Sequence, residues 1–291
     1  MATEQTRENR ISEQEIKKVL EQEGYLVEDD LALVLSLADL LRKPLLLEGP
    51  AGVGKTDLAR CLARGLHMEL IRLQCYEGLD ERHALYEWNY QKQLLYLESQ
   101  KDGSWDTLEA ELFSESFLLA RPILKAFLSE QRAVLLIDEI DKSDEEFESF
   151  LLEALSDFAV TIPERGTVKA RTKPLVILTS NGTRDFSDAL KRRCVHYYID
   201  YPPEEREAAI LQARIPAIGE RLSLDIARFV ADLRRKSLRK KPSLAETLDW
   251  AEVLVSLGIG DLSNETITAT YPFLLKYQED LEWLKKEKKR K

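Results

Sequence analysis

The residues with the clearest chemical potential lie at positions 49 to 56, where the sequence reads GPAGVGKT. Gly49, Gly54, Lys55 and Thr56 have the spacing of the phosphate-binding pattern G-x-x-x-x-G-K-[ST]. The glycines let the backbone curl so that successive N–H groups point at one anion, which the positive end of the following helix dipole also attracts. The pattern predicts that Lys55 reaches the β- and γ-phosphates of a nucleotide and that the Thr56 hydroxyl binds magnesium.

The segments on either side of this loop support nucleotide binding. PLLLE, at 44–48, reads as a buried strand, and DLARCLARGL, at 57–66, reads as a helix. A glycine-rich turn that binds nothing is the alternative, but strand, loop and helix follow one another in the order that the pattern requires. We therefore predict that the nucleotide contacts Gly49, Pro50, Ala51, Gly52, Val53, Gly54, Lys55, Thr56 and Asp57, together with Asp138.

Asp138 and Glu139 are the second group of candidate catalytic residues, and they follow the apolar run AVLLI. A buried strand that ends there places both carboxylates at the carboxyl edge of a sheet, beside the phosphate loop. We expect Asp138 to hold magnesium through water and Glu139 to act as the general base for the water that attacks the γ-phosphate. A solvated acidic helix start is the alternative, and it suits the acids at 144–146 better than Asp138.

Composition limits the other classes of function. A chain of 291 residues with 44% hydrophobic and 32% charged residues fits one large domain, or a large and a small one, with a polar surface. MATEQTRENR, at the N-terminus, lacks the apolar segment of a signal peptide, and no apolar run approaches membrane-spanning length. Cys61, Cys75 and Cys194 are scattered, as in reduced cytosolic proteins. We expect a cytoplasmic protein without membrane insertion.

The order of the elements predicts an α/β protein. Strand-like runs at 69–75, 133–138, 174–180 and 195–201 alternate with helical segments, which implies a parallel sheet covered on both faces. An N-terminal helix begins near Ser12 and ends at Gly24, and another spans 29–41. After Pro202 and Pro203 the pattern becomes helical only, with helices expected near 204–214, 222–235, 243–256 and 272–289.

These motifs together resemble those of the AAA+ ATPases, and within them the MoxR family with its CoxD-like subgroup. The resemblance rests on GPAGVGKT (49–56), LLIDEIDKS (135–143), LTSN (178–181) and DALKRRCVHYYIDYPP (188–203), and it runs from about Gly24 to about Leu257. LQCYEGLDERHALYEWNYQKQLLYLE (73–98) and KPSLAETLDWAEVL (241–254) are similar to the CoxD-like subgroup. It implies an AAA+ P-loop NTPase core with a parallel sheet flanked by helices, followed by a small all-helical lid domain. The domains would be an N-terminal helix at 1–28, the nucleotide-binding core at 29–202 and the lid with a basic tail at 203–291.

The resemblance also implies further catalytic residues. Asn181 matches the first sensor, which orients the attacking water, although an asparagine in a tight SNG turn is the alternative. Arg193 matches the arginine finger that a neighbouring subunit inserts beside the γ-phosphate, and the adjacent Arg192 could share that role. A solvated basic patch is the alternative for both arginines. A finger that acts on a neighbour implies a ring, usually a hexamer.

Two regions leave questions open. The second sensor of the family is usually an arginine at the start of a lid helix, where this chain has Ala245, and the cations at 239–241 could replace it or belong to a solvated helix end. A helix-2 insert at about 76–118 and a pre-sensor hairpin at about 159–173 would face the ring axis and touch substrate. Tyr86, Trp88 and Tyr90 in the insert could equally be local packing.

The resemblance implies an ATPase that uses ATP and Mg²⁺ for chaperone-like remodelling. Its client would be a metalloenzyme or complex that it assembles or supplies with a metal cofactor, with a von Willebrand A domain protein as partner. A motor subunit of a nucleic-acid-processing complex of the McrB type is the alternative, because basic clusters lie at 234–241 and 285–291. The net charge of −10 makes nucleic acid an unlikely partner. A non-hydrolysing nucleotide switch is the third possibility, which Glu139 and Arg193 argue against.

Overall fold

The computed structural model describes residues 10–100, 108, 111–263 and 266–288. These residues form two compact units, which we call the sheet unit and the helical unit. The sheet unit comprises the described residues of Met1–Val19, Glu28–Glu48 and Ala59–Tyr197. The helical unit comprises those of Leu20–Val27, Gly49–Leu58 and Tyr198–Lys291, so that the phosphate loop is grouped with the C-terminal helices.

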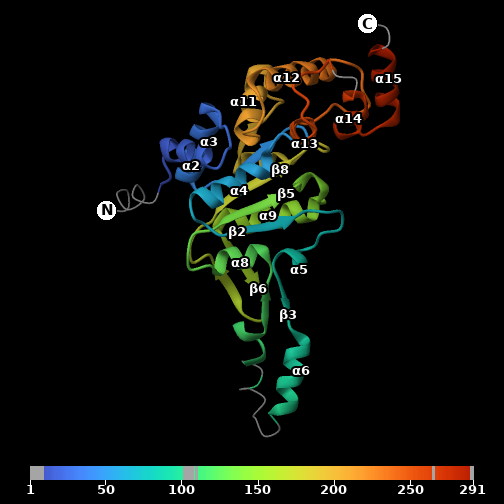
Figure 1. Ribbon diagram of the computed structural model, residues 1–291. Coiled ribbons are helices and arrows are strands. Elements are labelled where there is room, and N and C mark those ends of the chain that lie inside the picture. The colour runs from blue at the N-terminus through green and yellow to red at the C-terminus, as the bar shows by residue number, and fades with distance from the viewer. Residues whose placement is uncertain (1–9, 101–107, 109–110, 264–265, 289–291) are drawn as a thin grey trace. The chain divides into compact units, whose positions relative to one another are not determined.

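The sheet unit is built around five strands in the order β2-β5-β8-β1-β9 (Figure 1). β2 pairs with β5, β5 with β8 and β8 with β1, each in parallel, so these four strands end at one edge of the sheet. Continuous apolar sequence fits strands that are buried on both faces. The strands are β1 (Leu45–Glu48), β2 (Leu70–Gln74), β5 (Val134–Asp138), β8 (Leu175–Ser180) and β9 (Val195–Tyr198).

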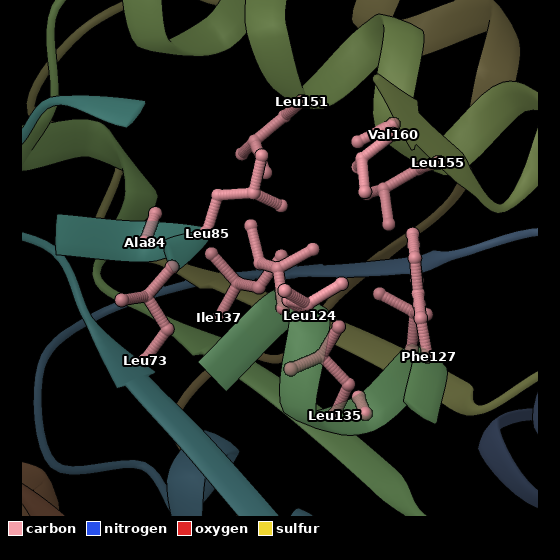
Figure 2. Packing of buried hydrophobic residues seen from close by; sticks show 14 of the residues in the cluster. Leu73, Ala84, Leu85, Leu124, Phe127, Leu135, Ile137, Leu151, Leu155 and Val160 are labelled. Atoms are coloured by element: carbon pink, nitrogen blue, oxygen red, sulfur yellow. The ribbon is translucent and has the colours of Figure 1, made fainter. Parts of the chain in front are cut away.

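Helices cover this sheet and fill the core between the layers. The helices that precede or flank the strands are α2 (Glu13–Gln22), α3 (Asp29–Leu41), α4 (Lys55–Gly65), α8 (Pro122–Leu128), α9 (Glu145–Asp157) and α10 (Asp188–Arg193), and a 3-10 turn, η2, spans Ile140–Lys142. Figure 2 shows Leu124 and Phe127 of α8 packed with Leu135 and Ile137 of β5 and with Leu151 and Leu155 of α9. Burying these side chains fixes β5, and with it the carboxylates that end β5, against both helices.

The segment predicted as a helix-2 insert contains small elements of its own. They are α5 (Glu81–Ala84), β3 (Tyr86–Trp88), α6 (Tyr90–Ser99), η1 (Glu115–Phe117) and β4 (Leu118–Ala120), and β3 pairs with β4 in antiparallel fashion. Residues 101–107 and 109–110 of this segment lie outside the described residues. Trp88 is buried against Phe113 and Tyr86, whereas Tyr90 is 63% exposed. Local packing therefore accounts for Tyr86 and Trp88 but not for Tyr90.

A second antiparallel pair lies within the segment predicted as the pre-sensor hairpin. β6 (Ala159–Ile162) pairs with β7 (Gly166–Lys169), and Ile162 pairs with Gly166 next to the turn. Gly166 has a φ of +82°. A residue with positive φ close to the turn is what a tight hairpin requires.

The helical unit contains five C-terminal helices around one apolar core. They are α11 (Glu204–Arg214), α12 (Glu220–Arg234), α13 (Leu244–Ser256), α14 (Ile267–Leu274) and α15 (Gln278–Lys288). Trp250, Tyr271 and Phe229 pack ring against ring in this core. Residues 1–9 of the predicted N-terminal segment, and residues 289–291, which include the end of the helix predicted at 272–289 and of the basic tail, lie outside the described residues. Within the described ranges, none of the helices combines the length and apolar character that crossing a membrane requires.

Two predicted elements were wrong in extent. The single helix expected at 272–289 is two helices, because Leu275 is extended (φ −112°, ψ 127°) and the chain turns so that Leu274, Leu275 and Leu284 all reach the same core. The strand expected at 195–201 ends at Tyr198. Beyond it, the carboxylate of Asp200 accepts the backbone N–H of Tyr201, a local hydrogen bond that competes with ladder pairing.

Candidate active site

The phosphate loop follows β1 directly, and two of its glycines have no possible replacement. Gly49 has a φ of +155°, and a Cβ built there would lie 2.0 Å from the backbone oxygen of Ile199. Gly52 has a φ of +75°, and a Cβ there would lie 2.6 Å from the Cβ of Ser243. A side chain at either position would strain the backbone because φ is positive. It would also clash with the backbone of Ile199 in one case and with the side chain of Ser243 in the other. The loop therefore has the tight curl that the sequence pattern predicts.

The donor groups of this loop fit an anion of the size and charge of a nucleotide phosphate. The backbone N–H groups of residues 51–54 donate no hydrogen bond within the part of the chain that the structure describes. The ammonium of Lys55, which is only 6% exposed, donates to the oxygens of Gly49 and Pro50 at 2.7 and 2.8 Å and so lies across the loop. Both features stand at the N-terminus of α4, where the helix dipole favours negative charge.

The loop is also held by the other segments of the helical unit. Asp57, in the first turn of α4, pairs with the guanidinium of Arg214 at the end of α11. The backbone N–H of Ala245 donates to the oxygen of Gly52 at 3.1 Å, so the N-terminus of α13 abuts the loop. Ser243 and Glu246 form a complete capping box at that N-terminus.

Two of the three cations that could replace the second sensor, Arg239 and Lys240, have partners of their own. Lys240 pairs with Glu246 at 2.7 Å. The guanidinium of Arg239 lies over the ring of Tyr277, 4.2 Å from its centroid. Of the three cations at 239–241, only Lys241 has an exposed side chain without a partner among the described residues.

The acidic pair at the end of β5 is held by side chains from both neighbouring strands. Asp138 is 2% exposed; its Oδ1 accepts the Thr179 hydroxyl at 2.5 Å, and its Oδ2 accepts the Arg72 guanidinium at 3.0 and 2.5 Å. Glu139 accepts Gln74 Nε2 at 2.8 Å and Lys142 Nζ at 2.5 Å, both on Oε2. The structure thus brings the two predicted carboxylates together within one hydrogen-bonded cluster.

Glu139 has a backbone conformation that directs it out of the strand. Its φ of 57° and ψ of 49° lie in the left-handed region, which is uncommon for a residue other than glycine. Its N–H donates to Thr179 Oγ1 at 2.9 Å, and that bond fixes the peptide. Glu139 Oε1 accepts no hydrogen bond among the described residues, whereas Oε2 accepts two.

Burial raises the pKa of two thiols of the sheet unit, and one of them, Cys75, lies near this cluster. Burial, with a further contribution from the charge of Asp138, raises the pKa of Cys75 to about 12. Burial likewise raises the pKa of Cys194 to about 12. Since the thiolate is the nucleophilic form, this shift favours the unreactive thiol at both cysteines.

The remaining predicted residues lie at two further positions of the sheet unit. Asn181, half-buried, directly follows β8, at the sheet edge where β5 also ends. Arg192 and Arg193 are the last two residues of α10, and both are exposed. Neither arginine side chain has a hydrogen-bond or ion-pair partner within the described chain. The structure therefore groups Asp138 with Glu139 and leaves the two arginines separate and accessible.

Sequence reasoning missed Thr179, Arg72 and Gln74. Arg72 and Gln74 alternate with the buried Ile71 and Leu73 of β2, and this period-2 pattern shows that both polar side chains share a face. The alternating pattern does not show which strand lies beside β2. In the structure Gln74 pairs with Asp138 of β5, and this register places Arg72 and Gln74 beside the carboxylates.

We expect Thr179→Val to destabilise the sheet unit by about 1–3 kcal/mol, because it removes the hydroxyl that bridges Asp138 and the Glu139 N–H and leaves both without that partner. Valine has the same shape, so packing is preserved. Urea unfolding measures the loss. Thr161→Val, at an exposed threonine of β6, is the matched control and should have no effect; equal stability of both variants would contradict the bridging role.

A parallel sheet with a phosphate loop after β1 and paired carboxylates after β5 defines a P-loop nucleoside triphosphatase. The model of the ATPase family associated with various cellular activities (AAA) matches residues 45–201, and the chain belongs to this family. It is an ATPase. The fold predicted from sequence is therefore confirmed, whereas the MoxR subgroup remains a prediction.

Individual relatives add little about function. Uncharacterized proteins of Staphylococcus epidermidis and Staphylococcus aureus are each 26% identical to this chain, and the matches cover 77% and 78% of it and 79% and 84% of their own lengths. Among solved structures, the P216G mutant of RuvB from Thermotoga maritima is 17% identical with a TM-score of 0.50. That match covers 90% of this chain and 70% of RuvB, and it shows the shared fold alone.

Proposed function

We propose that this AAA ATPase binds ATP with Mg²⁺ and hydrolyses it in a ring of identical subunits, a hexamer, to remodel a client protein. AAA+ ATPases commonly form ring oligomers. The observation that carries the proposal is the state of the two arginines at the end of α10, which are exposed and without a partner in the described chain. Such cations suit a finger that serves the site of a neighbouring subunit.

Each residue of the site has a role in this proposal. Lys55 and the N–H groups of the loop would bind the phosphates, and Thr56 and Asp138 would hold the metal. Bound Mg²⁺ supplies positive charge that neutralises the phosphate oxygens. Glu139 takes the proton of the attacking water on Oε1, because Gln74 and Lys142 engage its other oxygen.

Asn181 orients the attacking water and the finger arginine neutralises charge on the γ-phosphate. Asn181 stands at the end of β8, the strand whose Thr179 fixes the peptide of Glu139, which supports a role beside the base. Arg193 or Arg192, supplied by the neighbour, acts on charge that develops during hydrolysis.

Remodelling rather than nucleic-acid movement is supported by the ion pairs that most cations of the basic cluster at 234–241 form within the chain. Four of its cations pair with carboxylates of the helical unit: Arg234 with Glu207, Arg235 with Glu204 and Asp232, Arg239 with Glu279, and Lys240 with Glu246. Cations that are already paired have little to offer to a phosphate backbone. The sequence resemblance supports the finer reading, a MoxR-type protein of the CoxD-like subgroup with a von Willebrand A domain partner and a metalloenzyme client.

An ATPase assay on the full chain, with and without DNA, tests the proposal. We expect Mg²⁺-dependent hydrolysis that DNA leaves unchanged and that a von Willebrand A domain partner captured from the source cell alters. Native mass spectrometry with ATP should find six copies of the 33.5 kDa chain. Lys55→Ala, which removes the main cation for the phosphates, is the inactive control. Strong stimulation by DNA would favour a nucleic-acid motor, and an assembled ring without hydrolysis would favour a switch.

A further inference from the structure

The loop that joins Asn181 to α10 is bound at its C-terminal end by a buried carboxylate, that of Glu148 on α9. Glu148 is 3% exposed. Its Oε1 accepts the backbone N–H of Ser187 at 3.0 Å and also the Ser187 hydroxyl. Its Oε2 accepts Arg184 Nη1 at 3.0 Å. Both oxygens of Glu148 therefore bind the same short loop.

Ser187 is also the N-cap of α10, the helix that ends in the two arginines. The Ser187 hydroxyl accepts the backbone N–H of Leu190 at 3.2 Å, so one side chain both caps the helix and binds Glu148. α10 has only six residues, and a helix of that length does not fix its own orientation. Its direction therefore depends on the contacts at its ends and on the buried side chain of Leu190.

Glu148 must be ionised to accept all of these hydrogen bonds, because every one of its partners is a donor. Burial alone would raise the pKa of Glu148, but the hydrogen bonds from Ser187 and Arg184 outweigh burial and lower it. Arg184 lies over the ring of Phe186, 4.9 Å from its centroid, and its Nε and Nη2 have no hydrogen-bond partner in the described structure. Glu148 is the carboxylate that compensates this guanidinium.

A second carboxylate from the same stretch of chain binds the start of the loop. Asp141, 5% exposed, accepts the hydroxyl of Thr183 at 2.6 Å and its backbone N–H at 3.3 Å, both on Oδ2. Asp141 and Glu148 follow the predicted base Glu139 by two and nine positions. The stretch that carries the base thus also holds the loop leading to the arginines.

The opposite end of α10 is held by the segment before β1. Lys43 Nζ donates to the backbone oxygen of Arg192 at 3.3 Å, and Val195 N donates to the oxygen of Pro44 at 2.8 Å. These bonds engage backbone atoms and leave the arginine side chains exposed. Glu148 at the start and Lys43 at the end together fix the position from which Arg193 extends.

We propose that Glu148 is a positioning residue for the arginine finger, which sets the direction of α10 in its own subunit and thereby serves the site of the neighbour. The proposal rests on the ring and the shared site proposed above. It assigns Glu148 no contact with nucleotide. Replacing Glu148 should therefore impair the arginine finger that the subunit contributes to its neighbour. It should not impair the nucleotide site within the same subunit.

Glu148→Gln is the variant of choice, because it keeps the shape and removes the charge. Its amide nitrogen would face either Ser187 or Arg184, and both of these are donors. We expect hydrolysis by the homogeneous variant to fall about a hundredfold, the cost of a catalytic group displaced by about 1 Å. The affinity for Mg·ADP should not change. Glu115→Gln, which removes an exposed partner of Arg165, is the matched control and should be fully active.

Mixed rings test the direction of the effect. Glu148→Gln mixed with Lys55→Ala should regain activity, because the Lys55→Ala subunit gives a sound finger to the intact Glu148→Gln site. Glu148→Gln mixed with Arg193→Ala should stay inactive, because neither subunit gives a working finger. Rescue in both mixtures, or in neither, would overturn the role of Glu148.

A third mixture tests the shared active site separately from the role of Glu148. Lys55→Ala mixed with Arg193→Ala should regain activity whenever sites are shared, whatever Glu148 does, so failure there would refute the shared site itself. Native mass spectrometry confirms that each mixture forms mixed oligomers. If Glu148→Gln does not fold, Arg184→Gln removes the same ion pair from a side chain that is 24% exposed, and the same pattern of rescue is expected.

Discussion

Replacing Glu139 by glutamine is expected to slow ATP hydrolysis by about 10²–10⁴-fold, the usual contribution of a general base, while ATP binding stays intact. The amide has nearly the same shape, but it cannot accept the proton that a carboxylate oxygen takes. Gln74 and Lys142 engage Oε2, and the peptide of Glu139 is fixed by Thr179, so the variant side chain keeps its surroundings.

Single-turnover hydrolysis and binding of a fluorescent ATP analogue measure the two properties separately. Glu146→Gln, at an exposed acid in the first turn of α9, is the matched control and should hydrolyse ATP like the parent. A Glu139→Gln protein with the parental rate would show that another group takes the proton. A variant that no longer binds ATP would show that Glu139 supports the fold of the site instead.

Local signals were sufficient for much of the fold. The helix predicted at 29–41 and the helix predicted at 204–214 have those bounds in the structure, since their apolar spacing and acidic first turns are properties of the segments themselves. The loop at 49–54 was predictable for the same reason, because its glycines and Lys55 are adjacent in the chain. In these three segments one stretch of sequence carries the whole signal, and the prediction agrees with the structure.

Contacts between distant segments could not be read from the sequence. Thr179 and Arg72 bind Asp138 from β8 and β2 because the order β2-β5-β8 places those strands on either side of β5. No spacing along the chain encodes that order. Glu148 is a similar case, since an acid in the first turns of α9 reads as a solvated helix start until Ser187 and Arg184 are found beside it.

The break between α14 and α15 shows how tertiary packing overrides a local pattern. Residues 272–289 carry enough helix-forming sequence to predict one helix over that range. In the structure Pro272 lies inside α14, and the chain extends at Leu275. Burying Leu274, Leu275 and Leu284 in one core outweighs the propensity of the residues between them.

Replacing Arg193 by alanine is expected to reduce hydrolysis by about 10³-fold or more, the usual contribution of an arginine finger, without changing the affinity for Mg·ADP. The finger acts mainly on charge that develops in the transition state, so the ground-state complex of a subunit with its own nucleotide is unaffected. The exposed position of Arg193, with no partner in the described chain, means that alanine removes no internal contact. Stability of the subunit should therefore be unchanged.

Lys191, Arg192 and Arg193 are consecutive, exposed and equal in charge, so single alanine variants of all three identify the finger. General electrostatic attraction would give three small and similar losses, whereas one finger gives a large loss at a single position. Arg193→Lys keeps the charge but not the planar fork of donors, and we expect it to recover only part of the activity. Initial rates at saturating ATP, with assembly checked by native mass spectrometry, provide the comparison. A large loss of hydrolysis in the Arg192 variant alone would assign the finger to Arg192. Parental rates for all three variants would refute a finger on α10.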